Sequence, residues 1–357
     1  MPHPMLNISF SETGLIVPQT SLRDIPALAR RAGVGRVLIK LESERPLGNF
    51  KVLGGMYAGL RVLADQVGST ISALVEKQGR HPDLPRLICA SDGNHGLSVA
   101  AAAQSAGTPA TIYLHNGVPP YRAHRIKSLG ASIEWTEGTY DDAVDEAAAA
   151  ARRGEGILVP DTTSDAFCPV VQHVMHGYTT LTQELVVQLA CLDVRLTHSF
   201  IQAGVGGLAA AVSEGLQSIE ARAGTMIVVE PESAACVARA LATGEPERLA
   251  GDLATSATML SCGLASAPAL AILREYGAQA VALTEAQLDD AVLILFEEAG
   301  IATTASGAAG LAGLLHVAAD AQLRNSYGLD YDSTVLLIVT EAASSQPGEK
   351  GLGGSSR

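Results

Sequence analysis

One lysine lies in an apolar, glycine-rich segment, RPLGNFKVLGGMYAG at residues 45–59. Lys51 directly follows Phe50 in this segment. A solvated lysine normally has polar neighbours, because its ammonium is strongly hydrated and costly to bury. Two roles fit the pattern: an aliphatic stem that covers apolar surface, or a desolvated amine that acts as a nucleophile or forms a Schiff base. This segment alone favours the first role.

A polar loop, ASDGNHGLSVA at residues 90–100, is a candidate binding site. Short polar side chains and free backbone N–H groups between a strand and a helix can bind a carboxylate, and an amide can donate to a ring hydroxyl. Helix N-caps favour the same residue types, but five successive polar or glycine residues exceed what a cap needs. For the histidine, a structural hydrogen bond is the preferred role. The candidate residues are Ser91, Asp92, Gly93, Asn94 and His95.

A glycine-rich turn follows an apolar strand in QAGVGGLAA, residues 202–210. Such a turn directs backbone N–H groups and a helix dipole at an anion, most often a phosphate. A turn that needs glycine only for packing fits equally well. A dinucleotide site is disfavoured, because Ala209 breaks the G-x-G-x-x-G spacing and Glu230 is followed by proline. The candidate residues are Gly204, Val205, Gly206, Gly207 and Leu208.

An aspartate follows another strand directly, in VPDTTSDAFCP at residues 159–169. Asp161 would place a carboxylate at the mouth of the same cleft, or would cap the following turn, and the segment does not separate these roles. All three loops lie where a strand leads into a helix. Open α/β sheets bind ligands at such carboxyl ends of strands.

The elements that position these loops alternate between strand and helix. This alternation, with short connections, predicts parallel sheets with helices on both faces. A long helix at about residues 170–190 separates two such series. Strands are predicted at residues 36–42, 86–91, 109–115, 131–137, 156–161, 198–204, 225–231 and 333–341.

At 357 residues, the chain exceeds one compact core. We therefore predict two α/β domains, with the smaller one inserted into the larger one and the ligand site in the cleft between them. The strand at 36–42 is assigned to the second sheet. The larger domain comprises residues 1–55 and 193–345, the smaller one residues 56–192, and residues 346–357 form a disordered tail rich in glycine and serine.

The composition excludes several classes of protein. Hydrophobic residues make up 47% of the chain and charged residues 17%, which is typical of a globular protein. The net charge of −13, with no basic run to offset it, argues against a nucleic-acid partner. No signal peptide or membrane span is predicted. The five cysteines lack metal-ligand spacing, which indicates reduced thiols in a cytoplasmic protein with no metal site.

Together, the motifs resemble those of the fold type II pyridoxal-phosphate (PLP) enzymes, the family of threonine dehydratase and the tryptophan synthase β chain. GNFK is similar to that family's lysine motif, SDGNHG to its asparagine loop and GVGGL to its phosphate-binding loop, in the same order. The resemblance covers about residues 35–345 and is strongest to the diaminopropionate ammonia-lyases. Asp92 before Gly-Asn-His, HGYTT at 176–180, VEPESAAC at 229–236 and Thr340-Glu341 carry that finer resemblance.

The resemblance implies a role for each motif. Lys51 would form a Schiff base with PLP, with a pKa lowered by desolvation and by the cationic ring. Phe50 would shape the floor of the cofactor site, and residues 204–208 would bind the phosphate through their N–H groups. Asn94 would hydrogen-bond the ring 3-hydroxyl. Thr340 would face the pyridine nitrogen and leave it neutral, which suits elimination.

The resemblance implies an α,β-elimination on a small amino acid such as 2,3-diaminopropionate, and it implies a homodimeric enzyme. The substrate carboxylate would bind at residues 91–95, and Lys51 and Asp92 would exchange the α-proton on opposite faces. Aminoacrylate would then hydrolyse to a 2-oxo acid and ammonia. Asp92 and Asp161 would also hold a β-ammonium group and handle its proton.

One departure from the family's pattern leaves the substrate open. Ala342 and Ala343 stand where the family has a glycine and an aspartate. A β-replacement synthase of specialised metabolism and a serine/threonine-type dehydratase therefore remain alternatives. A non-catalytic amino-acid-binding module is disfavoured, because Lys51, Asn94 and the glycine loop are all intact.

Overall fold

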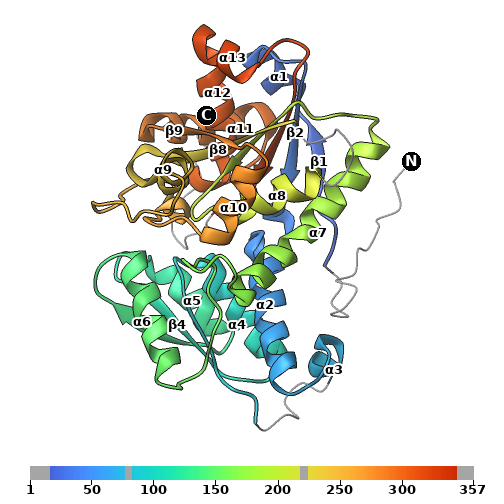
Figure 1. The fold of residues 1–357 in the computed structure, drawn as a ribbon. Helices are drawn as coiled ribbons and strands as arrows, with labels where there is room; N and C mark the ends of the chain where they lie inside the picture. Colours follow the sequence, from blue (N-terminus) through green and yellow to red (C-terminus); the bar gives the residue numbers. More distant parts are fainter. Residues whose placement is uncertain (1–16, 77–82, 218–223, 344–357) are drawn as a thin grey trace, which may run out of the picture.

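The computed structural model describes residues 17–76, 83–217 and 224–343. Its strands form two sheets (Figure 1), which confirms the predicted α/β class. The larger sheet has the order β1 (Leu22–Asp24), β2 (Arg36–Leu41), β10 (Thr334–Val339), β7 (His198–Gln202), β8 (Thr225–Pro231), β9 (Gln279–Leu283). The smaller sheet has the order β5 (Ser132–Thr136), β4 (Ala110–His115), β3 (Leu87–Ala90), β6 (Ile157–Leu158). The predicted tail, residues 346–357, lies outside the described residues.

The strand pairing is parallel throughout, except at one edge. β1 pairs antiparallel with β2, so the larger sheet is mixed rather than purely parallel. β2 pairs with β10, which confirms the assignment of residues 36–42 to the second sheet. Sequence patterns missed β1 and β9. Both are short edge strands with exposed residues, so they lack the continuous apolar run of a buried parallel strand.

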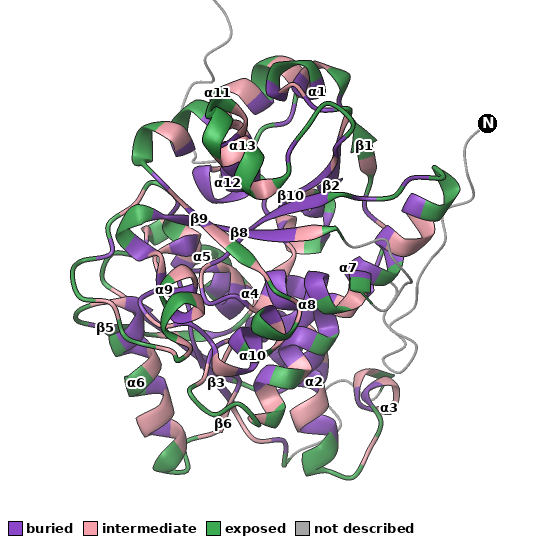
Figure 2. Ribbon diagram, turned by 45° about the horizontal axis from the view of Figure 1, so that its top comes forward, coloured by how far each residue is buried: buried purple, intermediate pink, exposed green. Residues whose placement is uncertain are grey.

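Helices cover both sheets, and the buried residues concentrate on the strands and on the helices between the sheets (Figure 2). The helices of the first half are α1 (Pro26–Ala32), α2 (Lys51–Gln66), α3 (Ile71–Glu76), α4 (Asn94–Ala106), α5 (Pro120–Ser128), α6 (Tyr140–Arg152) and α7 (Pro169–Cys191). Those of the second half are α8 (Gly207–Gln217), α9 (Cys236–Thr243), α10 (Ala267–Glu275), α11 (Glu285–Ala299), α12 (Ala305–Ala319) and α13 (Ala321–Tyr327).

Two helices, α2 and α7, carry the chain between the sheets and pack against each other. Their crossing requires glycine on each side. A Cβ on Gly54 would overlap the carbonyl of Val174, and a Cβ on Gly177 would overlap the carbonyl of Leu53. The glycines after Lys51 therefore serve helix packing, and they hold the start of α2 in place against α7.

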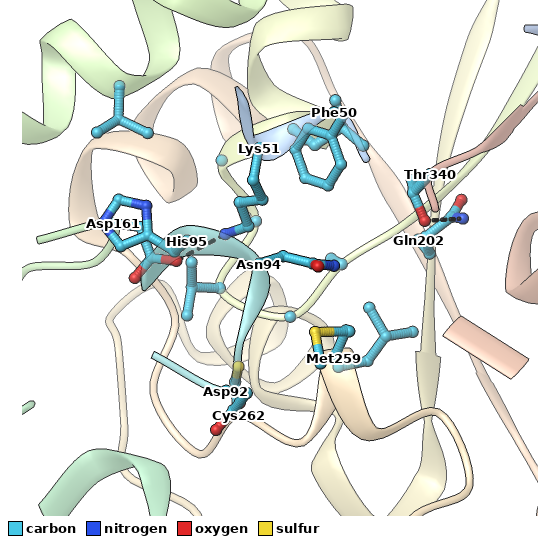
Figure 3. Close-up of a pocket in the computed structure, with 18 of the residues that line it drawn as sticks. Phe50, Lys51, Asp92, Asn94, His95, Asp161, Gln202, Met259, Cys262 and Thr340 are labelled. Carbon is cyan, nitrogen blue, oxygen red and sulfur yellow. Dashed lines mark hydrogen bonds and ion pairs between the residues drawn. The ribbon is translucent and has the colours of Figure 1, made fainter. Parts of the chain in front are cut away.

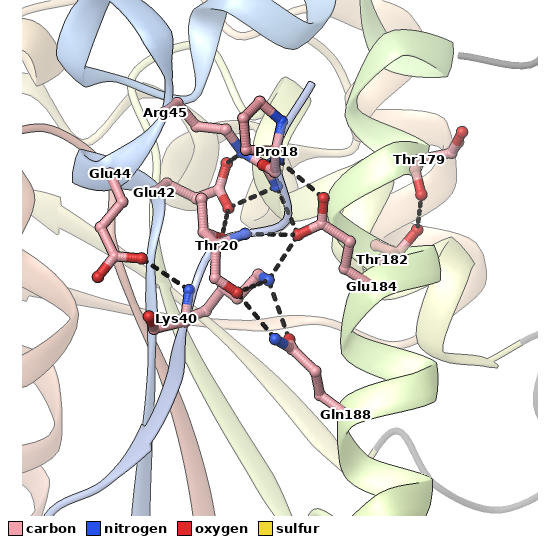
Figure 4. Close-up of polar contacts among 11 residues, drawn as sticks. Pro18, Thr20, Lys40, Glu42, Glu44, Arg45, Thr179, Thr182, Glu184 and Gln188 are labelled. Atoms are coloured by element: carbon pink, nitrogen blue, oxygen red, sulfur yellow. Dashed lines mark hydrogen bonds and ion pairs between the residues drawn. The ribbon is translucent and has the colours of Figure 1, made fainter. Parts of the chain in front are cut away.

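A buried cluster of charges fixes the segment that precedes α2 (Figure 4). Lys40 Nζ lies 2.6 Å from a Glu184 carboxylate oxygen, and Arg45 Nη2 lies 2.7 Å from the same oxygen. Arg45 Nε also donates to Glu42 at 2.8 Å. All four side chains are fully buried. Two cations balance two carboxylates, so the cluster joins β2 to α7 without a net buried charge.

A further buried carboxyl group lies near the end of β8. Glu230 is fully buried, and its two oxygens accept hydrogen bonds from the backbone N–H groups of Val237 and Ala238 at the start of α9. Burial raises the pKa of Glu230 to about 8, although these two hydrogen bonds oppose the shift. Glu230 therefore caps the start of α9, and burial makes its charged form unfavourable.

This raised pKa predicts a pH-dependent stability. The protonated carboxyl group stabilises the fold fully below the unfolded pKa of 4.5, and that contribution is lost as the pH rises through about 8. Between about pH 5.5 and about pH 8.5, the wild-type protein should lose on the order of 3 kcal/mol of unfolding free energy through Glu230, and we expect Glu230→Gln to abolish this loss. Urea unfolding at both pH values measures it. The neighbouring exposed Glu232, changed to Gln, is the control. Equal pH dependence in both variants would contradict this account.

Within residues 17–76, 83–217 and 224–343, no helix combines the length and apolarity needed to cross a bilayer.

Candidate active site

A pocket lies between the two sheets, at the carboxyl ends of β3, β7 and β10 (Figure 3). All of the predicted site residues except Gly93 line it, although they come from segments far apart in the sequence. Its lining residues include Phe50, Lys51, Ser91, Asp92, Asn94, His95, Tyr140, Asp161, Met175, Tyr178, Gln202, Gly204, Val205, Gly206, Gly207, Leu208, Met259, Cys262, Thr340 and Glu341.

Lys51 is the first residue of α2, and backbone contacts hold it against the end of β10. Phe50 N donates to the Thr340 carbonyl at 3.1 Å, and Ala342 N donates to the Gly48 carbonyl at 2.9 Å. Asn49 and Glu341 form an antiparallel bridge between these two bonds. The lysine motif and the Thr340 segment are thus paired through the backbone, which fixes the position of one relative to the other.

The amine of Lys51 forms an ion pair across the pocket. Its Nζ lies 2.6 Å from Asp161 Oδ2, and the Tyr140 hydroxyl donates to Asp161 Oδ1 at 2.5 Å. Burial is the largest single effect on the pKa of the Lys51 ammonium and lowers it, but the charge of Asp161, the charge of Tyr178 and the hydrogen bond to Asp161 together raise that pKa above its usual value. The lowered pKa expected of Lys51 beside the cationic ring of PLP stays a prediction.

The pKa of the partner carboxyl group, Asp161, shifts in the opposite direction. Burial by itself would raise the pKa of Asp161, but the charge of Lys51 and the hydrogen bonds from Lys51 and Tyr140 hold it well below its usual range. Asp161 is consequently a fixed negative charge in the pocket. Its predicted position at the mouth of the cleft agrees with this geometry, and its contact with Lys51 excludes a role limited to capping a turn.

Asp92 is the second carboxylate of the pocket, and its environment differs from that of Asp161. Its Oδ1 lies 3.0 Å from Nε2 of His115, and Arg122 donates to its backbone carbonyl at 3.2 Å. Burial raises the pKa of the Asp92 carboxyl group, and the neighbouring His115 and Arg122 only partly offset this. The two carboxyl groups therefore differ in proton affinity. Such a difference allows one carboxyl group to act as an acid and the other to stay ionised.

The remainder of the polar loop is held by its own contacts. Ser91 Oγ accepts from the N–H groups of Gly93 and Gly96, both at 2.8 Å. Nε2 of His95 lies 2.8 Å from the Val159 carbonyl, and burial lowers the pKa of His95. His95 thus makes the structural hydrogen bond expected of it. Gly93, with a φ of 138°, lines an adjacent cavity instead of the pocket. A substrate-binding role for this loop stays a prediction.

Asn94 begins α4 and reaches across the pocket to the end of β10. Its Nδ2 donates to Oε2 of Glu341, whose other oxygen accepts from the Thr304 hydroxyl. Glu341 was not among the predicted site residues, although it follows Thr340 directly in the sequence. Thr340 itself is buried, and its hydroxyl accepts from Nε2 of Gln202 at 3.2 Å (Figure 3).

The glycine loop connects β7 to α8. Gly206 has a φ of +97°, which L-residues with a side chain rarely adopt. A Cβ on Gly204 would lie only 3.0 Å from Sγ of Cys262. Because the first N–H groups of a helix have no intrahelical partner, the start of α8 at Gly207 presents donors for an anion.

Several lining residues carried no sequence signal of their own. Tyr178 is buried on α7, and its ring lies 5.0 Å from that of Phe50 between centroids. Burial raises the pKa of its hydroxyl to about 12, and that hydroxyl has no hydrogen-bond partner among the described residues. Tyr140, Gln202 and Cys262 also reach the pocket only through the tertiary fold.

These features fit PLP as a resident cofactor. The pocket offers a lysine amine, an anion-binding turn at the far side, an aromatic ring beside the lysine and a buried hydroxyl for a ring nitrogen. The orphaned hydroxyl of Tyr178 and the side-chain-free loop at Gly204 and Gly206 leave polar atoms and space that a phosphorylated ring would occupy. The chemistry of the site and the fold therefore point to the same cofactor.

Comparisons with known proteins agree with this assignment. The family described as "Pyridoxal-phosphate dependent enzyme" matches residues 14–341. Diaminopropionate ammonia-lyase from Escherichia coli is 33% identical over 333 residues, which cover 90% of this chain and 84% of that protein. L-threonine ammonia-lyase from Thermotoga maritima is 27% identical over 301 residues, which cover 84% of this chain and 68% of that protein.

A solved structure is similar over the same extent. The Escherichia coli diaminopropionate ammonia lyase in complex with an aminoacrylate-PLP azomethine reaction intermediate superimposes with a TM-score of 0.80. That chain is 32% identical, and the match covers 90% of this chain and 84% of that one. The predicted resemblance to the fold type II family is thereby confirmed.

Proposed function

The chain belongs to the pyridoxal-phosphate dependent enzymes, and we propose that it is an ammonia-lyase that performs α,β-elimination on a small amino acid with a cationic β-substituent, such as 2,3-diaminopropionate. The products are a 2-oxo acid and ammonia. The observation that carries the proposal is the Lys51–Asp161 ion pair, at 2.6 Å, in a pocket that also holds the carboxyl group of Asp92. The similarity to diaminopropionate ammonia-lyase supports the same substrate class.

The residues that hold the cofactor are assigned by their positions. Lys51 provides the amine, and the turn formed by residues 204–208 provides N–H donors for the phosphate. Phe50 and Asn94 would contact the ring, and Thr340 would interact with its nitrogen. Bound there, PLP supplies an electron-withdrawing ring that stabilises negative charge at the substrate's α-carbon. The chain's own residues supply binding and proton transfer.

Asp161 links substrate charge to the state of Lys51. The ammonium of Lys51 must lose a proton before its nitrogen can act as a nucleophile or base. Its raised pKa depends on the carboxylate of Asp161. A β-ammonium group that pairs with Asp161 in place of Lys51 removes this stabilisation, so the pKa of Lys51 falls. A cationic β-substituent is therefore bound in preference to a neutral one, and its binding lowers the pKa of Lys51. The lysine then loses its proton more readily and can act as a nucleophile or base.

Asp92 provides the second proton-transfer group. Because burial raises its pKa, its carboxyl group can both hold and release a proton closer to neutral pH than an ordinary aspartate. We assign it the exchange of a proton opposite Lys51. Residues 91–95 would bind the substrate carboxylate at the N-terminus of α4, where helix N–H groups favour an anion.

Substrate discrimination tests the function directly. We expect the holoenzyme to release ammonia and a 2-oxo acid from one or both enantiomers of 2,3-diaminopropionate, with kcat/KM at least about 10-fold above that for serine, because the β-ammonium gains a charge-assisted hydrogen bond to Asp161. Coupled assays of both products measure this. Asp161→Asn should remove the preference. Asp165→Asn, an exposed residue of the same loop, is the control. Serine as the better substrate, or no 2-oxo acid at all, would reject the proposal.

Three broader properties are proposed on the family resemblance. They are a homodimeric state, a cytoplasmic location and the division of the chain into two domains. The larger domain comprises residues 1–55 and 193–345, and the smaller one comprises residues 56–192. All strands of the smaller sheet lie within residues 56–192, which supports the third. The enclosed pocket between the two sheets supports a small molecule, the amino-acid substrate, as the binding partner.

A further inference from the structure

A second cavity, of about 250 Å³, adjoins the active-site pocket. Asn94 and Glu341 line both, so the hydrogen bond between them forms the shared wall. Tyr121, Arg122 and Arg125 on α5 form the opposite side. The remaining lining residues are Leu47, Gly48, Gly93, Leu97, Thr304, Ala342 and Ala343.

This cavity is positively charged, which is unusual in a chain with a net charge of −13. Neither Arg122 nor Arg125 forms an ion pair with a carboxylate among the described residues. Arg122 donates to the Asp92 carbonyl, to the Tyr121 hydroxyl and to the Thr258 hydroxyl. Glu341 is the one acidic residue among the described lining residues, and Asn94 and Thr304 already donate to it. The lining thus carries two guanidinium groups and one carboxylate, and that carboxylate already accepts two hydrogen bonds. The cavity therefore has a net positive charge.

The position of Arg125 is set by a constrained loop. Its Nη2 donates to the Leu47 carbonyl at 2.7 Å, and Asn49 Nδ2 donates to the same oxygen at 3.0 Å. Leu47 has a φ of 67°, a left-handed conformation that is unfavourable for a residue with a side chain. The loop that holds Arg125 at the cavity thus includes Leu47, which lies four residues before Lys51 along the chain.

The floor of the cavity is small and uncharged. Ala342 and Ala343 are exposed, and Ala342 N donates to the Gly48 carbonyl, which fixes the segment in place. Their methyl groups leave room beside the guanidinium groups. A carboxylate at either position would neutralise part of the positive charge and compete with an incoming anion.

We propose that this cavity is a binding site for the oxyanion of a small acidic ligand, a carboxylate or a phosphate. Arg122 and Arg125 are the donors, since guanidinium groups match the geometry of both anions. Its source is either a diaminopropionate-like substrate whose β-amino group carries a carboxylate-bearing branch that reaches past Asn94, or a separate small anion. The first source rests on the proposed function, whereas the site itself does not.

Titration calorimetry with succinate and with inorganic phosphate tests the site in the holoenzyme. Bound PLP keeps the phosphate-binding turn occupied. Arg125→Gln, compared with Lys127→Gln, then separates anion binding in the second cavity from binding at the proposed substrate-carboxylate site of residues 91–95. We expect Arg125→Gln to weaken binding by about 10-fold or more, because it removes one charge-assisted contact. Lys127→Gln, the same charge change on the same helix but outside the cavity, should alter binding less than about 2-fold.

A substitution in the floor gives an independent test. Ala343→Asp should weaken anion binding by about 10-fold or more through repulsion, whereas the neutral isostere Ala343→Asn should retain it. No measurable binding to wild type, or equal loss in Arg125→Gln and Lys127→Gln, would overturn the proposal.

Kinetics then identify the source of the anion. If succinate raises KM for diaminopropionate without changing kcat, and Arg125→Gln but not Lys127→Gln removes that effect, the two sites overlap and the anion belongs to an extended substrate. If succinate binds without affecting KM, the ligand is separate. Succinate binding by a protein that eliminates no amino acid would reject the proposed function and leave the site standing.

Discussion

Lys51→Ala is expected to lower the rate of elimination by on the order of 10⁴-fold or more, because the substitution removes the nucleophile and a proton-transfer group together. The purified wild-type protein should show the yellow absorption of a lysine-bound PLP, and borohydride should fix the cofactor covalently. The variant should bind PLP only reversibly, through the turn at residues 204–208, so borohydride treatment followed by dialysis should leave it colourless.

The variant also separates binding from chemistry. Removing Lys51 leaves Asp161 without its cationic partner, and the Tyr140 hydroxyl remains its donor. The pKa of Asp161 should therefore rise from its depressed value, because the charge of Lys51 is a main cause of that depression. Lys127→Ala, at an exposed position on α5, is the control and should retain colour and activity. Covalent cofactor on Lys51→Ala after borohydride would assign the Schiff base to another lysine and reject the site.

Glu184→Ala is expected to cost about 3–5 kcal/mol of unfolding free energy, the largest stability effect predicted for this chain. Glu184 accepts hydrogen bonds from Lys40, Arg45 and the Thr20 backbone. Without it, two buried cations face the single carboxylate of Glu42. The effect is large because the partners are fully buried and cannot recover hydration.

Urea unfolding of the holoenzyme measures this effect. The matched control is Glu247→Ala, which breaks an exposed ion pair with Arg239 at 2.9 Å and should cost less than about 1 kcal/mol. A loss below about 1 kcal/mol in Glu184→Ala would show that water reaches the cluster. The same variant should disturb the segment between Arg45 and Lys51, so lower activity of the folded protein is a second expected result.

The sequence by itself determined which residues lie at the ends of strands. Periodicity placed α7 closely, at about residues 170–190 against the observed Pro169–Cys191, because helix and strand repeats are local signals. The three loops were assigned to one site for a similar reason: carboxyl ends of parallel strands share one edge. Joint occurrence of the motifs then identified the family.

Only the tertiary structure decided which side chains meet. The packing of the smaller sheet against the larger one brings Glu341, after β10, to Asn94, after β3, across 247 positions of the chain, and no local pattern encodes that contact. The ion pair of Lys51 with Asp161 spans 110 positions and reverses the pKa shift that burial alone predicts. The buried cluster around Glu184 and the second cavity at Arg125 likewise depend on distant segments. Electrostatic interactions follow distances in space, so their sign and strength are fixed only when the chain is folded.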